Sequence, residues 1–196
     1  MIEHVYPHDK DWKEKPIKGF YQIVHAGNGE FIRAKRAGPH AIIQISAICE
    51  SVVSSIDPVI DLEKKISAPA IAGIYKDFLN HLPNERLVWI SKDGMMLAPK
   101  QRASRGMVKA LDPFHPSLEH VIFDVHSHNK MEAYFSGQDD EDECKGFRVY
   151  IVIGRVGSGR PQIKARIGCF GQFLNIPIQT VADLPSALKF EDIHEA

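Results

Sequence analysis

The sequence lacks any long apolar run, which limits the classes of protein to which it can belong. No window approaches the ~18 uninterrupted apolar residues of a membrane-spanning helix. Residues 1–7 have no basic start followed by an apolar stretch, so we expect no secretory signal. The three cysteines, Cys49, Cys144 and Cys169, are far apart and odd in number, which argues against a disulfide framework or a four-cysteine zinc site. A reduced, cytoplasmic protein is the expectation.

An excess of charge of either sign is also missing. The 24 basic and 25 acidic residues leave a formal net charge of −1, so no global field attracts nucleic acid or an anionic membrane, and we expect neither as a partner. The 196 residues, 44% of them apolar, suffice for one ordinary globular domain with a modest appendage.

The N-terminal third has the pattern of β-structure. Residues 20–24 and 31–35 flank the turn-forming residues 27–29, which predicts a hairpin, and residues 41–48 can add a third strand. We therefore expect a small β-rich region over residues 1–60.

A helix is predicted next, between Ser67, which can cap it, and Pro83, which ends it. Pro69 suits the first turn. The apolar residues of this segment recur at helical spacing and define one face: Ile71, Ile74, Tyr75, Phe78 and Leu82. Strands are expected at 87–90 and 95–97. The basic residues 99–109 are expected to form a solvated loop, and the alternative is a contact surface for an acidic partner.

The remaining segments alternate between apolar runs and turns. Residues 121–128 form the strongest predicted strand. The runs 146–156 and 162–170 are joined by the glycine-rich residues 157–161, which lack the Lys-Ser/Thr of a phosphate loop and therefore predict a hairpin turn. A short helix is expected near residues 184–190.

Two histidines lie on the strongest predicted strand, in the sequence His126-Ser127-His128. Because side chains alternate between the faces of a strand, His126 and His128 point to the same side and can bind one metal ion. The apolar residues before them hold the strand in a core, which gives the pair the rigidity that a metal site needs. Taken alone, the pair is explained equally well by a structural or incidental role.

The spacing downstream favours the metal. Seven residues separate His128 from Ser136-Gly137-Gln138-Asp139. If Ser136 opens a helix, Asp139 lies about one turn away on the same face and can supply a third, anionic ligand. Three protein ligands leave a position open, as in catalytic zinc sites. Two imidazoles and one carboxylate suit Zn²⁺ better than Mg²⁺ or Ca²⁺.

The pattern His126-X-His128, seven residues, Ser136-X-X-Asp139 resembles the motif of the JAMM metalloproteases, also called MPN⁺ or JAB proteins, at every motif position. The resemblance covers approximately residues 67–180. It implies an α/β fold in residues 67–196, namely a mixed, curved sheet of the cytidine deaminase-like type with flanking helices, preceded by the small β-rich region.

The family motif also has a glutamate after a helix and at the start of a strand, and Glu85 fits that place. Arg86 and Leu87 follow it, where the family often has a Cys-Gly or similarly small pair, so Glu50 and Glu63 stay as alternatives. The resemblance implies that the glutamate takes a proton from a zinc-activated water and delivers it to the leaving amine. It also implies that the Ser136 hydroxyl stabilises the tetrahedral oxyanion.

These roles imply a deubiquitinase-like zinc metallopeptidase that hydrolyses peptide or isopeptide bonds. By resemblance, the bond follows the C-terminal glycine of a ubiquitin-like protein. Residues 136–143 and the extra N-terminal region also resemble protein A of the PRTRC mobile-element systems. That narrower resemblance implies an E1-like enzyme and a ubiquitin-like protein as genomic neighbours.

Other interpretations remain open. Residues 123–128 also resemble the Asp-X-His-X-His strand of PHP phosphoesterases and amidohydrolases, although those folds need more ligands and only His194 follows as a further histidine. A metallo-β-lactamase site would need an aspartate where Lys130 stands. A non-catalytic MPN-like scaffold that binds protein partners is the remaining alternative, and such domains usually lose the ligands that are present here.

Two further expectations concern residues around the motif. The acidic residues 140–143 are expected at the solvated start of a helix, where the helix dipole favours them. The alternative is that one of them contacts a ligand imidazole. Trp89, on a predicted strand, is expected in the core.

Overall fold

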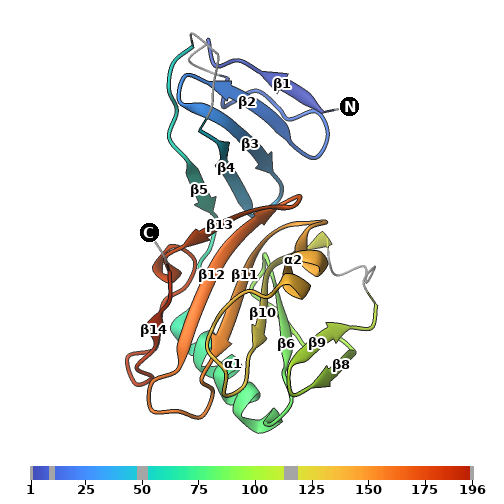
Figure 1. Cartoon of the computed structure of the whole chain (residues 1–196), viewed down its shortest axis with the longest axis vertical. Coiled ribbons are helices and arrows are strands. Elements are labelled where there is room, and N and C mark those ends of the chain that lie inside the picture. The colour runs from blue at the N-terminus through green and yellow to red at the C-terminus, as the bar shows by residue number, and fades with distance from the viewer. Residues whose placement is uncertain (1, 9–11, 48–52, 113–118, 195–196) are drawn as a thin grey trace. The chain divides into compact units, whose positions relative to one another are not determined.

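The computed structural model describes residues 2–8, 12–47, 53–112 and 119–194, and the chain divides into two compact units, residues 1–63 and 64–196 (Figure 1). Each unit has a sheet and buried apolar residues of its own. Among the described residues, no helix has the length and apolar character needed to span a membrane.

The N-terminal unit contains a five-stranded sheet with the order β1-β2-β3-β4-β5. The predicted hairpin and its third strand are confirmed, because β2 and β4 both pair antiparallel with β3. β1 and β5 are too short for alternation to reveal them. The strands are β1 (Glu3–Val5), β2 (Gln22–Ala26), β3 (Gly29–Lys35), β4 (Pro39–Ser46) and β5 (Val59–Leu62).

Glycine is required where the β2–β3 turn ends. Gly29 has a φ of 140°, and a Cβ placed there would lie 2.0 Å from the backbone oxygen of Ser46. One core cluster of this unit contains Trp12, Val24, Ala26, Phe31, Ile42 and Ile56.

The C-terminal unit is built on a seven-stranded mixed sheet with the order β13-β12-β11-β10-β6-β7, in which β14 also pairs with β12. This sheet occurs together with the helices α1 and α2, which confirms the prediction of an α/β fold at this level. The strands are β6 (Leu87–Ser91), β7 (Met96–Leu97), β10 (Val121–Ser127), β11 (Phe147–Gly154), β12 (Gln162–Cys169), β13 (Gln172–Ile176) and β14 (Glu191–Asp192).

The centre of this sheet determines where the motif residues lie. β10 and β11 are adjacent and parallel, so the chain between them must cross over the sheet. The crossover carries helix α2 (Gly137–Glu143). Residues 149–154 of β11 are all buried, as expected for a central strand covered on both faces. Trp89, on β6, is 3% exposed, which confirms it as a core residue.

Helix α1 (Ala68–His81) has the predicted extent. Its apolar face is buried through Ile71, Ile74, Tyr75 and Phe78, because these residues recur every three or four positions. Ser67 occupies the N-cap position, but its side chain makes no capping hydrogen bond.

The expectation of a loop over residues 99–109 is wrong, although the basic residues of this segment are exposed to solvent as expected. The chain forms a hairpin of β8 (Gln101–Ser104) and β9 (Met107–Ala110). The basic residues of this segment suggested a loop, but the contacts that hold the hairpin are made by its other residues. The side-chain amide of Gln101 forms hydrogen bonds with both the backbone N–H and the carbonyl of Leu87. Val108 and Ala110 pack against the buried residues Leu87, Trp89 and Val121.

The helix expected near residues 184–190 is also wrong. From β13 to residue 194, helical structure is limited to the short 3₁₀ helix η2 (Ile178–Thr180). The backbone N–H of Glu191 donates to the carbonyl of Pro161, and that of Ile193 donates to Ile163, so this segment pairs with the sheet. The ring of Phe190 packs edge-on against Tyr75. This apolar residue is therefore packed against helix α1 although its own segment is not helical.

Candidate metal centre

The two histidines of the motif lie side by side at the end of a central strand. β10 lies between β6 and β11, so its backbone is held on both sides. His126 and His128 are each 5% exposed, and their ring centroids are 5.2 Å apart. Alternation along β10 directs both rings to one face.

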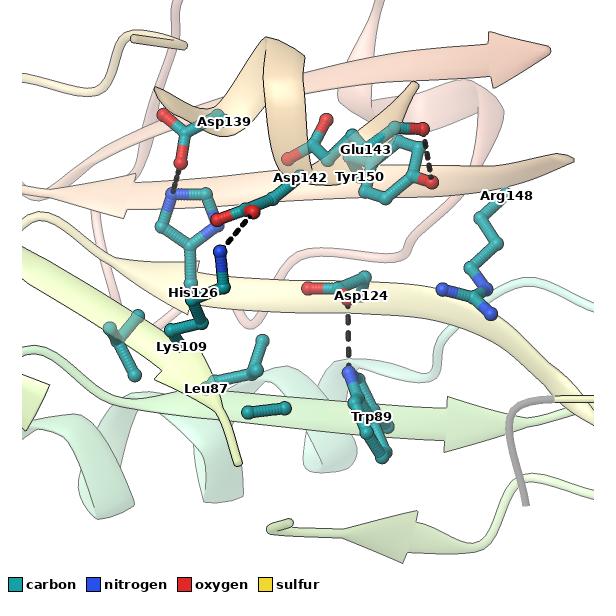
Figure 2. Close-up of a pocket in the computed structure, with 12 residues that line it drawn as sticks. Leu87, Trp89, Lys109, Asp124, His126, Asp139, Asp142, Glu143, Arg148 and Tyr150 are labelled. Atoms are coloured by element: carbon teal, nitrogen blue, oxygen red, sulfur yellow. Dashed lines mark hydrogen bonds and ion pairs between the residues drawn. The ribbon is translucent and has the colours of Figure 1, made fainter. Parts of the chain in front are cut away.

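Asp139 is brought to this face by helix α2. Ser136 is the N-cap residue, and Ser136 and Asp139 form a reciprocal capping box at the start of the helix. The Asp139 Oδ1 atom lies 3.5 Å from His126 Nε2, and Oδ2 lies 3.9 Å from His128 Nε2. Figure 2 shows Asp139 on the helix facing the ring of His126 on the strand below. One ligand atom from each of the three residues lies within 4.8 Å of the others.

The protonation states of the three side chains suit metal binding. Burial lowers the pKa of His126 to about 4, and burial also lowers the pKa of His128. Burial alone would raise the pKa of Asp139. The electrostatic effect of His126, the two hydrogen bonds that Ser136 donates, and the electrostatic effect of His128 together hold this pKa below its usual value. At neutral pH the cluster therefore offers two neutral imidazoles and one carboxylate, which are the ligand forms that a metal requires.

The donor set fits a zinc ion. Two nitrogens and one oxygen is a common ligand set of catalytic zinc. His126 Nε2 is buried and makes no hydrogen bond, and a buried polar atom without a partner is costly unless a ligand satisfies it. His126, His128 and Asp139 are thus the residues that could hold the metal.

Glu85 lies beside His128, one of the two histidines. Arg86 and Ser127 are paired by two hydrogen bonds of 2.9 Å, so antiparallel register puts Glu85 next to His128. Glu85 is 3% exposed, and its Oε1 atom makes no hydrogen bond. Burial, followed by the charge of Asp139, raises the pKa of Glu85 to about 7. Such a carboxyl can take up and release a proton near neutral pH.

The two alternative glutamates have different positions. Glu63 is exposed and belongs to the N-terminal unit. Glu50 lies outside the described residues.

The Ser136 hydroxyl is already engaged. It donates to Asp139 Oδ2 at 2.6 Å and accepts from the backbone N–H of Asp139 at 3.2 Å. The backbone N–H of Ser136 also donates to Asp139 Oδ2, at 2.6 Å. In this structure Ser136 therefore orients the carboxylate of Asp139, which differs from the oxyanion role that the family resemblance implies.

A pocket extends from His126 and Asp139 between β10 and α2 (Figure 2). Asp124 faces into it and accepts a hydrogen bond of 3.0 Å from the indole nitrogen of Trp89. Burial raises the pKa of Asp124 to about 6. The motif does not include Asp124, yet the alternation that aligns His126 with His128 also aligns Asp124 with them, so the signal was present in the sequence.

The expectation that residues 140–143 are solvated is wrong for Glu143. Glu143 is 8% exposed and forms an ion pair with the buried Arg166, on β12. Asp140 pairs with the same arginine, and Asp142 pairs with Lys109 on the β8–β9 hairpin. No property of the sequence near the motif identifies Arg166, because it lies 23 residues after Glu143.

Comparison with known proteins connects this site to a family. Residues 70–166 match the family of prokaryotic homologues of the JAB domain, and this range includes Glu85, His126, His128, Ser136 and Asp139. No curated protein matches the chain. The solution structure of protein DSY2949 from Desulfitobacterium hafniense aligns with a TM-score of 0.43 and 13% identity, covering 63% of this chain and 93% of that chain. The narrower resemblance to PRTRC protein A stays a prediction. Through residues 70–166, the chain belongs to the prokaryotic JAB family.

Proposed function

We propose that this protein is a zinc-dependent metallopeptidase that hydrolyses peptide or isopeptide bonds. The observation that carries the proposal is the cluster of His126, His128 and Asp139, whose ligand atoms lie within 4.8 Å of one another, beside the buried Glu85. Membership of the JAB family supports it. We further propose that the C-terminal unit has the cytidine deaminase-like arrangement of JAMM domains.

Different groups of the site have different roles in the proposed hydrolysis. Zinc held by His126, His128 and Asp139 would polarise the attacked carbonyl and would lower the pKa of a nearby water toward neutrality. The carboxylate of Glu85 accepts the proton that the water loses and returns it to the leaving amine, and a pKa of about 7 populates both forms of the carboxyl at neutral pH. Ser136 orients Asp139 through its hydroxyl and its backbone N–H.

The substrate we propose is the C-terminal tail of a ubiquitin-like protein, free or in a conjugate. An extended tail can add to an edge strand through backbone hydrogen bonds, with little dependence on its sequence. β7 ends the strand order of the large sheet on one side, and β8 and β9 form a two-stranded sheet of their own. These edges are suited to such a substrate.

Glu85→Gln tests the proposal most directly. The variant keeps the shape of the side chain, so it should bind one zinc per chain while its turnover of a ubiquitin-like precursor falls by about 10²–10⁴. Zinc is measured by elemental analysis and cleavage by mass spectrometry.

Glu63→Gln is the matched control, because Glu63 is exposed and lies in the other unit. It should leave both values unchanged, and Glu50→Gln should do the same. An active Glu85→Gln variant would refute the assignment of the base. A wild-type protein that takes up no zinc would refute the proposed function itself.

A further inference from the structure

Helix α2 carries Asp139, yet it has no apolar residue with which to pack on the sheet. Its sequence is Gly-Gln-Asp-Asp-Glu-Asp-Glu, and its buried residue is Glu143. A surface helix normally docks through an apolar stripe. Polar contacts must therefore hold α2 in place, and with it the third ligand of the proposed metal centre.

Arg166 makes buried contacts of this kind, beside the hydrogen bond of 3.1 Å that the Tyr150 hydroxyl donates to the backbone oxygen of Glu143. Arg166 projects from β12 and is 4% exposed. Its Nε and Nη2 atoms donate to Glu143 Oε2 at 2.9 and 2.6 Å, and Nη1 donates to Asp140 Oδ1 at 2.5 Å. One guanidinium thus binds two carboxylates of α2, at one and four positions after Asp139.

The same guanidinium is held between two aromatic rings. Its central carbon lies 3.9 Å from the ring centroid of Phe135 and 3.9 Å from that of Phe173. Phe135 directly precedes Ser136, so Arg166 contacts the chain on both sides of the segment from Ser136 to Asp139. A planar, delocalised cation can stack and bind carboxylates at the same time, which lysine cannot do.

Charge repulsion within α2 is a second reason why the helix depends on its contacts with Arg166. Residues 139–143 are five consecutive acidic residues, which repel one another on so short a helix. Arg166 pairs with two of them: its pair with Glu143 is buried, so salt screens it little, and its pair with Asp140 is half exposed. Lys109 pairs with Asp142, but that pair is about half exposed.

We infer that Arg166 is a positioning residue for the metal centre. It acts through Asp140, Glu143 and Phe135 to hold α2 where the Asp139 carboxylate reaches the Nε2 atoms of both histidines. The inference rests on the proposed zinc site.

Arg166→Lys tests this inference, because lysine keeps the charge of arginine and loses the stacked, forked geometry. Zinc affinity, measured by competition with a chromogenic chelator, should fall about 10–100-fold, as for other residues that orient metal ligands. The visible absorption bands of the cobalt-substituted protein should shift. Asp140→Asn removes a half-exposed partner without leaving a buried charge, and it should lower zinc affinity by less.

Arg33→Lys is the matched control. Arg33 is a buried arginine of the N-terminal unit, 2% exposed, and it donates to Gln22 and to the carbonyl of Lys15. Its variant should lower thermal stability and leave zinc affinity and the cobalt spectrum unchanged. If Arg166→Lys behaves like this control, the inference is overturned while the proposed function stands. A wild-type chain that binds no zinc overturns both.

Discussion

Among the residues that the structure describes, each unit contains a close pair of histidines. The ring centroids are 5.1 Å apart in the pair His4–His25 and 5.2 Å apart in the pair His126–His128. In the first pair the rings are stacked, and His4 Nδ1 lies 2.8 Å from His25 Nε2. The other ring nitrogen of His25 faces Glu30 at 3.0 Å. These histidines therefore satisfy each other and a neighbouring carboxylate.

The second pair differs in where its nitrogens point. His126 and His128 are buried, their rings are tilted by 50°, and the Nε2 atoms of both face the carboxylate of Asp139. Burial holds these imidazoles neutral, and His126 Nε2 makes no hydrogen bond. The comparison shows that ring spacing alone does not define a metal site. The proposed metal site differs in that the Nε2 atoms of both rings converge on one carboxylate and His126 Nε2 makes no hydrogen bond.

Replacing a histidine in each pair gives the strictest test of the comparison. His126→Ala should weaken zinc binding by more than the ~100-fold cost of a residue that only orients a ligand, because a direct ligand is lost. His25→Ala should leave the zinc content at one ion per chain. Elemental analysis after dialysis measures both. Two zinc ions per wild-type chain, with one of them lost in His25→Ala, would show that the pairs are alike.

Of the two pairs as described, the second has the buried carboxyl group of Glu85 beside it, whereas the Glu30 side chain beside the first is 40% exposed. This difference predicts a pH dependence. The folded-state pKa of Glu85 is raised to about 7 from 4.5, so protonated Glu85 is favoured in the folded protein and its ionisation destabilises the fold as pH rises through 7. Glu85→Gln should therefore stabilise the metal-free C-terminal unit at pH 8 relative to pH 5, by on the order of 2–3 kcal/mol. Urea unfolding with a chelator present measures it. An equal effect at both pH values would contradict the prediction.

The capping serine beside the second pair should matter less. Ser136→Ala removes the hydroxyl that accepts from the N–H of Asp139 and donates to its carboxylate, so the free energy of unfolding should fall by about 1 kcal/mol, with weaker zinc binding. Ser67→Ala is the control, because Ser67 is also an N-cap residue but its side chain makes no capping bond. Chemical denaturation of the two variants should separate them, and equal losses would be evidence against the cap.

The smallest effect is expected at the exposed ion pair above the pocket. Lys109 and Asp142 are 52% and 36% exposed at their side chains, so Lys109→Ala should cost about 0.2–1 kcal/mol. High salt should reduce the difference between variant and wild type. A loss of several kcal/mol would mean that the β8–β9 hairpin is held mainly by this pair and less by Gln101 and Val108.

Local pattern was enough to predict much of the fold. The hairpin in residues 22–35, helix α1 and the strands β10, β11 and β12 follow from alternation, helical spacing and turn residues. The β8–β9 hairpin and β14 were missed because their contacts are distant in sequence. Gln101 bonds to Leu87 and β14 pairs with β12, and neither partner is visible from the local pattern.

Of the candidate site, the sequence by itself determined which residues can serve as ligands. The period of two along a strand puts His126 and His128 on one face, and a capping residue three positions before Asp139 puts that carboxylate in the first turn of a helix. Tertiary structure decided the rest. It buried Glu85 next to Asp139 and so raised its pKa, and it brought Arg166 from β12 to the acidic residues of α2. The reason is physical: desolvation and ion pairing depend on which groups meet in space, and strand order determines that, whereas sequence distance does not.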